Sequence, residues 1–218
     1  MQSINFDNLI NRKDLLNSQQ LPNNLLELIS DRGKEWIMKI LSIYGVNNSQ
    51  IIKSKVPQQT VIEGPVYIGE NVKIEPYSYI KGPAFIGCDS EIRHGAYIRE
   101  YTYIGKNCVV GHTTEVKHSF FFDGAKASHF AYVGNSILGR HVNLGAGTKL
   151  ANLKLDRSTI SFLDPISKDK IDSGIKKFGA ILGDYSQTGC NCVLSPGTIF
   201  IPQAKILPCK HYRGTLNS

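Results

Sequence analysis

The chain has 218 residues and a formal net charge of +7, with 41% hydrophobic and 20% charged residues. This length is enough to bury a full core, and one main domain with an appendage is the natural organisation. No apolar run approaches the roughly 20 residues that a membrane-spanning helix needs. The polar start of the chain lacks the apolar core of a signal peptide. We therefore expect a cytoplasmic protein without membrane insertion.

The five cysteines form an odd set without C-x-x-C spacing, which predicts reduced thiols rather than a disulfide framework. They are Cys88, Cys108, Cys190, Cys192 and Cys209. Cys190 and Cys192 share one face of a strand, but no histidine or second cysteine pair stands near them in sequence. We expect no metal site there.

The positive charge favours anionic partners. Nucleic acid is one such class, but the basic residues are spread along the chain and no recognition helix is indicated. Sugar phosphates and coenzyme A are anions as well, and charge alone does not choose among these ligands. We expect no nucleic-acid partner.

The first segment, residues 1–58, is predicted to be helical. Asn23 or Asn24 is placed to cap a helix after Pro22, and Gly45 is placed to end it. Between them, apolar residues recur at steps of three and four, which predicts an amphipathic helix. They are Leu25, Ile29, Trp36, Ile40 and Tyr44. We interpret this segment as a cap over the open strand edge of the first coil described below. A partner-binding helix is the alternative.

From residue 62 to residue 116, an Ile or Val stands at every sixth position. The series is Ile62, Ile68, Ile74, Ile80, Ile86, Ile92, Ile98, Ile104, Val110 and Val116. A period of six fits neither a helix nor a simple alternating strand. It is typical of a parallel β-helix, in which each hexad forms one short strand and one corner and three hexads close a triangular coil. Glycines directly after the inward residue, such as Gly105 and Gly111, indicate close backbone packing.

The pattern continues with two five-residue steps, and it is interrupted once. The later inward positions are Phe121, Ala127, Val133, Leu138, Leu144, Leu150, Leu182, Thr188, Leu194, Phe200 and Ile206. The polar interruption at about 151–179 is predicted to leave the prism as an excursion loop, and loops of this length are usually functional or disordered. We therefore expect an all-β fold: a single-stranded left-handed parallel β-helix of hexapeptide repeats over 59–208, followed by a basic tail over 209–218.

Several polar side chains fall on adjoining coils and form a candidate site. Arg99 and Lys117 are eighteen residues apart, which is one full coil, so they are expected to stack about 5 Å apart. With no acidic residue at the matching step, such a pair suits a phosphate dianion. His129 lies outside the inward positions, on a neighbouring coil. Two solvated surface cations and a solvated histidine are the alternative interpretation.

Short motifs in this region resemble a known family. They are VGHTTEVK at 110–117, KASH at 126–129, VNLGAGT at 142–148, ANLKLD at 151–156 and KFGAILGD at 177–184. Together they are similar to the acetyltransferase domain of the bacterial bifunctional enzyme that makes UDP-N-acetylglucosamine. They are closer still to the C-terminal domain of archaeal sugar-1-phosphate nucleotidylyltransferases that also acetylate amino-sugar phosphates. The resemblance covers roughly residues 60–200.

The resemblance implies a role for each matching residue. His129 matches the general base of the acetyl transfer. Sugar and phosphate contacts are implied for Arg99, Lys117, Tyr132, Asn143 and Lys177. Acetyl-CoA contacts are implied for Asn152, Ala146 and Cys190. The implied reaction moves acetyl from acetyl-CoA to the amino group of an amino-sugar 1-phosphate such as glucosamine-1-phosphate, in UDP-N-acetylglucosamine biosynthesis.

The family forms homotrimers with sites between neighbouring prisms, so a trimer is expected by resemblance. Outward aromatic residues are candidates for its interface: Tyr67, Tyr77, Tyr79, Tyr97, Tyr103 and Phe120. The glycine-rich phosphate loop of a nucleotidyltransferase is absent, so no uridylyl transfer is expected. The repeats stop near Ile206, which leaves few residues for the donor site.

Two other functions remain open at this stage. One is a related acyltransferase with another acceptor, such as a nucleotide sugar, or with a longer acyl donor as in lipid A synthesis. The other is a non-catalytic β-helix subunit that serves a separate sugar nucleotidyltransferase.

Overall fold

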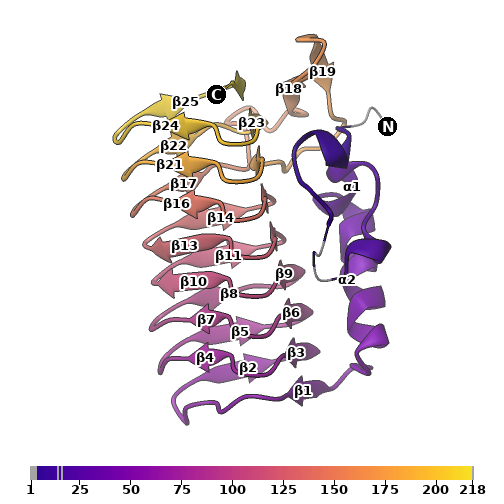
Figure 1. Cartoon of the computed structure of the whole chain (residues 1–218), viewed down its shortest axis with the longest axis vertical. Coiled ribbons are helices and arrows are strands. Elements are labelled where there is room, and N and C mark those ends of the chain that lie inside the picture. Colours follow the sequence, from indigo (N-terminus) through magenta and orange to yellow (C-terminus); the bar gives the residue numbers. More distant parts are fainter. Residues whose placement is uncertain (1–3, 14, 16, 218) are drawn as a thin grey trace.

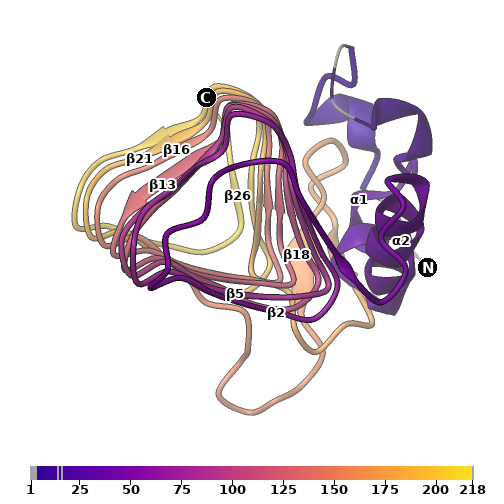
Figure 2. The same ribbon diagram turned by 90° about the horizontal axis from the view of Figure 1, so that it is seen from below.

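The computed structural model describes residues 4–13, 15 and 17–217. Its main body is a three-sided prism of parallel strands (Figures 1 and 2). Consecutive strands lie on successive sides, so three strands make one coil and each side is a parallel sheet. We name these sides sheet I, sheet II and sheet III. The predicted left-handed parallel β-helix is confirmed.

Sheet I has nine strands: β1 (Gln50–Ile52), β3 (Val66–Ile68), β6 (Ala84–Ile86), β9 (Thr102–Ile104), β12 (Phe120–Phe121), β15 (Ile137–Leu138), β20 (Ala180–Leu182), β23 (Thr198–Phe200) and β26 (Thr215–Leu216). Sheet II has eight: β2 (Val61–Glu63), β5 (Tyr79–Lys81), β8 (Tyr97–Ile98), β11 (Glu115–Lys117), β14 (Tyr132–Gly134), β17 (Lys149–Leu150), β22 (Val193–Leu194) and β25 (His211–Tyr212). Sheet III has seven: β4 (Lys73–Ile74), β7 (Glu91–Ile92), β10 (Val109–His112), β13 (Lys126–His129), β16 (Asn143–Leu144), β21 (Gln187–Thr188) and β24 (Lys205–Ile206).

The inside of the prism is a column of apolar side chains. The predicted inward positions from Ile68 to Phe200 are buried there, including Thr188, whereas Ile62 and Ile206 at the two ends are partly buried. In each coil, backbone N–H groups donate to carbonyls of the next coil; the Gly69 amide, for example, donates to the Ile86 carbonyl over 2.8 Å. The six-residue period therefore fixes both the core and the stacking register.

Glycine behind an inward residue is required where coils approach most closely. A Cβ atom built on Gly111 would lie 1.7 Å from the carbonyl oxygen of Ser128 on the next coil. Only a residue without a side chain fits this spacing.

The prism is longer than the sequence indicated. It begins at β1, within the 1–58 segment, and it continues through β25 and β26, so the predicted bounds 59–208 and the basic tail 209–218 are both corrected. Tyr212 and Leu216 take inward positions in the last coil and pack against the core. The sequence signal was weak because Tyr212, six residues after Ile206, is aromatic rather than β-branched.

The segment before the prism contains two 3-10 helices, η1 (Phe6–Asn8) and η2 (Ser18–Gln20), and two α-helices, α1 (Leu25–Leu28) and α2 (Asp31–Ile43). The Asn24 side chain caps α1 as predicted, by accepting a hydrogen bond from the Leu26 amide. The single predicted helix is divided in two because the Ser30 side chain accepts from the Arg32 amide and starts α2.

These helices lie along the outer face of sheet I rather than over the open edge of the first coil (Figures 1 and 2). Trp36 packs edge-on against Tyr103 and Phe120, with ring centroids 5.2 and 5.5 Å apart. The predicted position over the first coil is therefore wrong. Sheet I carries a ladder of large outward side chains that a prism alone would expose, and their burial decides where the helices dock.

This packing also corrects the predicted interface. Tyr67, Tyr103 and Phe120 are buried beneath the helices and are unavailable to another subunit. Tyr77 and Tyr97 are exposed.

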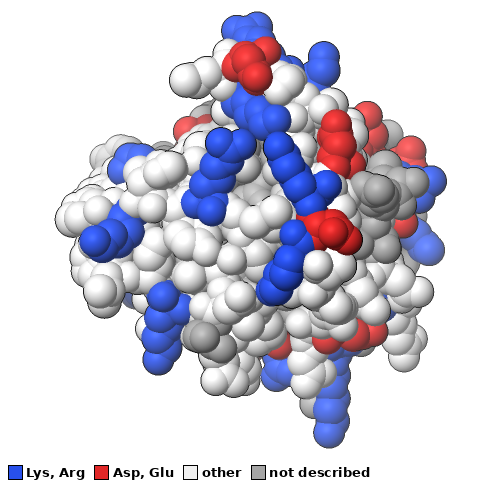
Figure 3. Space-filling view, turned by 90° about the horizontal axis from the view of Figure 1, so that it is seen from above, with Lys and Arg blue, Asp and Glu red and all other residues white. Residues whose placement is uncertain are grey.

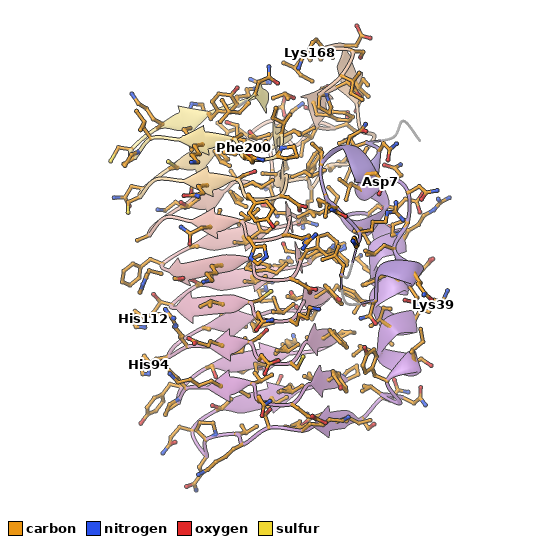
Figure 4. The ribbon with its side chains drawn as sticks, in the orientation of Figure 1. Asp7, Lys39, His94, His112, Lys168 and Phe200 are labelled. Atoms are coloured by element: carbon orange, nitrogen blue, oxygen red, sulfur yellow. The ribbon has the colours of Figure 1, made fainter. Side chains whose placement is uncertain are left out.

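Residues between β17 and β20 leave the prism as an excursion (Figure 2). They form an antiparallel hairpin of β18 (Ser161–Leu163) and β19 (Lys170–Asp172), and Lys168 lies near its tip (Figure 4). Phe162 and Phe178 anchor the excursion in the apolar cluster on sheet I. No helix among the described residues combines the length and apolarity needed to span a membrane.

We expect Trp36→Ala to lower the free energy of unfolding by about 3–5 kcal/mol, because it leaves a cavity between α2 and sheet I. Met38→Ala on the same helix, where the side chain is 38% exposed, is the matched control, and a change within about 0.5 kcal/mol is expected. Chemical denaturation followed by circular dichroism measures both. Equal effects of the two substitutions would contradict this docking.

Candidate active site

Sheet II and the corner where it turns into sheet I hold most of the predicted site residues. Strand β8 pairs with β11 so that Ile98 stands beside Val116, and Arg99 and Lys117 follow them in register. The Arg99 amide donates to the Val116 carbonyl over 2.8 Å. The predicted stacking of Arg99 on Lys117 is therefore what the coil register produces.

No acidic residue stands at the matching step, but acidic residues next to the pair in sequence accompany it. Glu115 lies two residues before Lys117 on β11, so strand alternation places both on the outer face. Its carboxylate accepts a hydrogen bond from Arg99 over 2.9 Å, and Glu100 lies 4.0 Å from the Arg99 Nε. The hydrogen bond that Arg99 donates to Glu115 raises the pKa of Arg99. Arg99 is thus neutralised and oriented by its own strand neighbours.

Lys117 is different, because no ion pair involves it among the residues that the structure describes. Burial lowers the pKa of Lys117, and the positive charges of Arg99 and Lys177 lower it further. Lys177 belongs to the segment that leads from β19 back to β20, which we call the returning arm of the excursion. It lines the same cleft as Lys117. Arg99, Lys117 and Lys177 thus lie close together, and Lys117 forms no ion pair with a described carboxylate. Such a cluster attracts an anion.

A chain of side-chain hydrogen bonds runs along the same corner. Tyr132 donates through its hydroxyl to Asn152 Oδ1 over 3.4 Å, and Asn152 Nδ2 donates to Asn135 Oδ1 over 2.8 Å. Asn135 Nδ2 lies 3.2 Å from His118 Nδ1. Because Asn135 accepts through its oxygen, its amide nitrogen is the donor to His118. The chain thus connects predicted residues Tyr132 and Asn152 to Asn135 and His118.

His118 is only 6% exposed and is held neutral. Burial, followed by the charge of Lys34, lowers the pKa of His118 to about 4, against a smaller opposing effect of the Leu28 carbonyl. With Nδ1 accepting from Asn135, the ring proton resides on Nε2. Among the described residues, that buried nitrogen makes no hydrogen bond of ordinary geometry, although the Leu28 carbonyl acts on the ring.

His129 lies at another corner, where sheet III turns into sheet II. It ends β13 and pairs with His112 on β10, and its ring is exposed. The rings of His94 and His112 stack 5.5 Å apart on the same corner, which forms one edge of the prism in Figure 4. Sheet II therefore separates the His129 ring from Lys117, and the predicted base and the cation cluster face opposite edges of one sheet.

The remaining predicted residues lie at or near the corner between sheets III and II that carries His129. Ala146 sits in the turn that stacks above His129, and the Gly147 amide donates to the His129 carbonyl over 3.0 Å. The Gly147 amide is therefore already engaged and is not available to a ligand. Cys190 is exposed on the next coil of this corner, and Asn143 is exposed on the outer face of sheet III.

The structure thus brings together Arg99, Lys117, Tyr132, Asn152 and Lys177, and it places His129, Ala146 and Cys190 along a second corner. Sequence reasoning missed Glu115, Asn135 and His118. Glu115 was detectable from strand alternation, whereas Asn135 stacks on His118, seventeen residues earlier, because this coil contains a five-residue step. Within the described ranges, no group of three or more His, Cys, Asp or Glu side chains is arranged to hold a metal ion.

A family model described as "GMPPB C-terminal domain" matches residues 80–213, which is more than half of the chain. The chain belongs to this family. The predicted resemblance to β-helix domains of sugar nucleotidylyltransferases and acetyltransferases is confirmed.

Curated relatives of this family member are longer proteins. A bifunctional sugar-1-phosphate nucleotidylyltransferase/acetyltransferase of Sulfurisphaera tokodaii is 34% identical over 82% of this chain and 44% of its own length. The bifunctional protein GlmU of Methanococcus aeolicus is 38% identical over 77% of this chain and 40% of its own length. The chain therefore spans less than half of these relatives. Among solved structures, a UDP-N-acetylglucosamine acyltransferase gives a TM-score of 0.41 at 12% identity, over 76% of this chain and 71% of that chain.

The depressed pKa of His118 predicts a pH-dependent stability. In the unfolded chain the imidazole has its ordinary pKa, so on acidification the unfolded state gains a proton that the folded state binds only near pH 4. The stabilising contribution is complete above about pH 6.5 and is lost as the pH falls towards 4, by about 3 kcal/mol in total.

This prediction is checked by denaturation at pH 7.5 and pH 4.5, with His118→Gln as the comparison. The variant is expected to lose less stability over this range than the wild type. Imidazole ¹⁵N spectra are expected to show a proton on Nε2 at neutral pH. A proton on Nδ1, or a His118 titration near pH 6.5, would contradict the assignment.

Proposed function

We propose that this domain transfers an acetyl group from acetyl-CoA to the amino group of an amino-sugar 1-phosphate such as glucosamine-1-phosphate, as part of sugar-nucleotide biosynthesis. The observation that carries the proposal is the unpaired Lys117 between Arg99 and Lys177. Burying a cation beside two other cations costs free energy unless an anion joins them. A sugar phosphate supplies that anion.

The acceptor in this proposal lies across the outer face of sheet II. Its phosphate contacts Lys117, Arg99 and Lys177, and its amine points towards the His129 corner. Tyr132 lies between these two places on β14, and its contact with Asn152 holds its hydroxyl at the sugar side. Asn143 contacts the sugar from the adjoining face. A neighbouring subunit of a homotrimer would close this face and exclude water.

The positive charge of the last coil supports binding of the acetyl donor, acetyl-CoA, at this end of the prism. Residues 201–217 contain Lys205, Lys210 and Arg213 and no Asp or Glu. Figure 3 views this end of the molecule, where Lys and Arg side chains are spread over the surface with some Asp and Glu side chains among them. Coenzyme A carries several phosphate charges, so this surface attracts it. Ala146 and Cys190 lie along the corner that leads from His129 to this coil.

The chemistry is a direct transfer. The amine nitrogen attacks the thioester carbonyl, a new C–N bond forms, and the C–S bond to coenzyme A breaks. His129 accepts the proton that the amine loses and returns it to the departing thiolate. Binding both substrates on one rigid prism provides the orientation that makes the attack effectively intramolecular.

We expect His129→Ala to lower kcat by about 10²–10⁴ without a comparable change in acceptor affinity, because it removes only the proton acceptor. The assay measures thiol release from acetyl-CoA with glucosamine-1-phosphate. His94→Ala is the matched control on the same corner, two coils away, and is expected to retain activity. Wild-type turnover of His129→Ala would refute the base assignment, and the absence of turnover with any amino sugar would favour the non-catalytic subunit.

We expect Lys117→Met to weaken acceptor binding by about ten- to a hundredfold, because a charged hydrogen bond to phosphate is lost. Calorimetric titration with glucosamine-1-phosphate measures this change. Lys73→Met, an exposed lysine on sheet III, is the control and is expected to bind as the wild type does. Unchanged affinity of Lys117→Met would count against the phosphate site.

A further inference from the structure

A cleft of about 680 Å³ opens beside the cation cluster, a size typical of small-ligand sites. Three parts of the chain form its walls: the α1–α2 junction, the corner between sheets II and I, and the returning arm of the excursion. Its lining includes Lys34, Tyr101, Lys117, His118, Lys176 and Lys177. Arg99 and Tyr132 lie outside this lining. Lys117 therefore stands between the outer face of sheet II and the cleft.

Positive charge in the cleft is only partly compensated. Lys34 is paired with Asp31 over 2.7 Å, and the lining carboxylate Glu100 is paired with Lys81, which lies outside the cleft, over 2.7 Å. Lys117, Lys176 and Lys177 have no ion pair to any residue in the described part of the chain. These three ammonium groups carry more positive charge than one phosphate dianion on the outer face of sheet II can neutralise.

His118 adds a fixed donor to the same wall. The hydrogen-bond chain from Asn152 through Asn135 occupies Nδ1 and leaves the proton on Nε2. The side chain is 6% exposed, and Nε2 makes no hydrogen bond of ordinary geometry to any described residue. A buried N–H without an acceptor is costly, and an anionic oxygen in the cleft removes that cost.

An aromatic surface lies next to these donors. The ring of Tyr101 lines the cleft, 6.0 Å from the His118 ring, and Lys34 Nζ lies 5.5 Å from the Tyr101 ring centroid. A planar base stacks favourably on such a ring. Tyr101 thus adds an aromatic face to the wall of the cleft that carries His118.

We propose that the cleft binds the second phosphoryl group and the base of a nucleoside diphosphate, so that the acceptor is a nucleoside-diphosphate amino sugar. This inference rests on the proposed acetyl transfer and specifies its substrate class. His118 Nε2–H and Lys176 contact the second phosphoryl group, Arg99 and Lys117 contact the phosphate next to the sugar, and Lys177 contacts both. Nucleotidyl transfer to the amino sugar then precedes acetylation, and the enzyme class that supplies the substrate is a sugar-1-phosphate nucleotidyltransferase.

Binding is tested by calorimetry with inorganic pyrophosphate and inorganic phosphate, which need no assumption about the base. We expect pyrophosphate to bind at least about tenfold more tightly than phosphate. Lys176→Gln and His118→Phe are each expected to weaken pyrophosphate binding by about tenfold. Lys39→Gln is the charge-matched control, because Lys39 is an exposed residue of α2 outside the cleft lining (Figure 4). Circular dichroism verifies folding, and the exposed Lys176 keeps the test valid if His118→Phe does not fold.

Activity is tested by thiol release from acetyl-CoA with glucosamine-1-phosphate and with UDP-, dTDP-, GDP- and ADP-glucosamine. We expect at least one diphosphate acceptor to exceed the monophosphate in kcat/KM by about tenfold or more. Equal affinity for pyrophosphate and phosphate, or wild-type pyrophosphate binding by both cleft variants, overturns the inference. A higher kcat/KM for glucosamine-1-phosphate than for every diphosphate acceptor also overturns it, while the proposed acetyl transfer stands. Variant-sensitive pyrophosphate binding without acetylation of any acceptor would uphold the diphosphate site and refute the transfer.

Discussion

One inward aliphatic or aromatic side chain per side of each coil holds this molecule together. The column from Ile68 to Phe200 is almost fully buried, and backbone hydrogen bonds between coils run parallel to it. A shift of one residue would turn every inward side chain outwards, so the register is strongly determined. Outward residues one coil apart are therefore brought side by side, and the stacking of Arg99 on Lys117 follows from that register.

Charge in the candidate site is only partly compensated within the described part of the protein. Glu115 neutralises Arg99, whereas Lys117 lies partly buried between Arg99 and Lys177 with its pKa lowered. The buried Nε2 of His118 also makes no hydrogen bond of ordinary geometry to any described residue. Each feature costs free energy in the unliganded protein, and each cost is removed by an anionic ligand. Costs of this kind gather at functional sites more often than at structural ones.

The helical segment links packing to binding. The outward ladder of Tyr67, Phe85, Tyr103 and Phe120 on sheet I requires an apolar cover, and α2 provides it through Trp36 and its neighbours. The same docking places the α1–α2 junction against the corner that carries Lys117 and His118. Burial of an apolar face thus builds one wall of the cleft, and the excursion builds another.

The amino-acid sequence by itself determined the prism, because a six-residue period of β-branched residues permits no other common fold. It also determined the stacking of Arg99 on Lys117, since strand register follows from that period. Three features were decided only by the tertiary structure: the docking of the helices on sheet I, the approach of Lys177 from the excursion, and the isolation of His118 Nε2. These depend on which side chains meet across segments far apart in the chain, and no local spacing encodes such contacts.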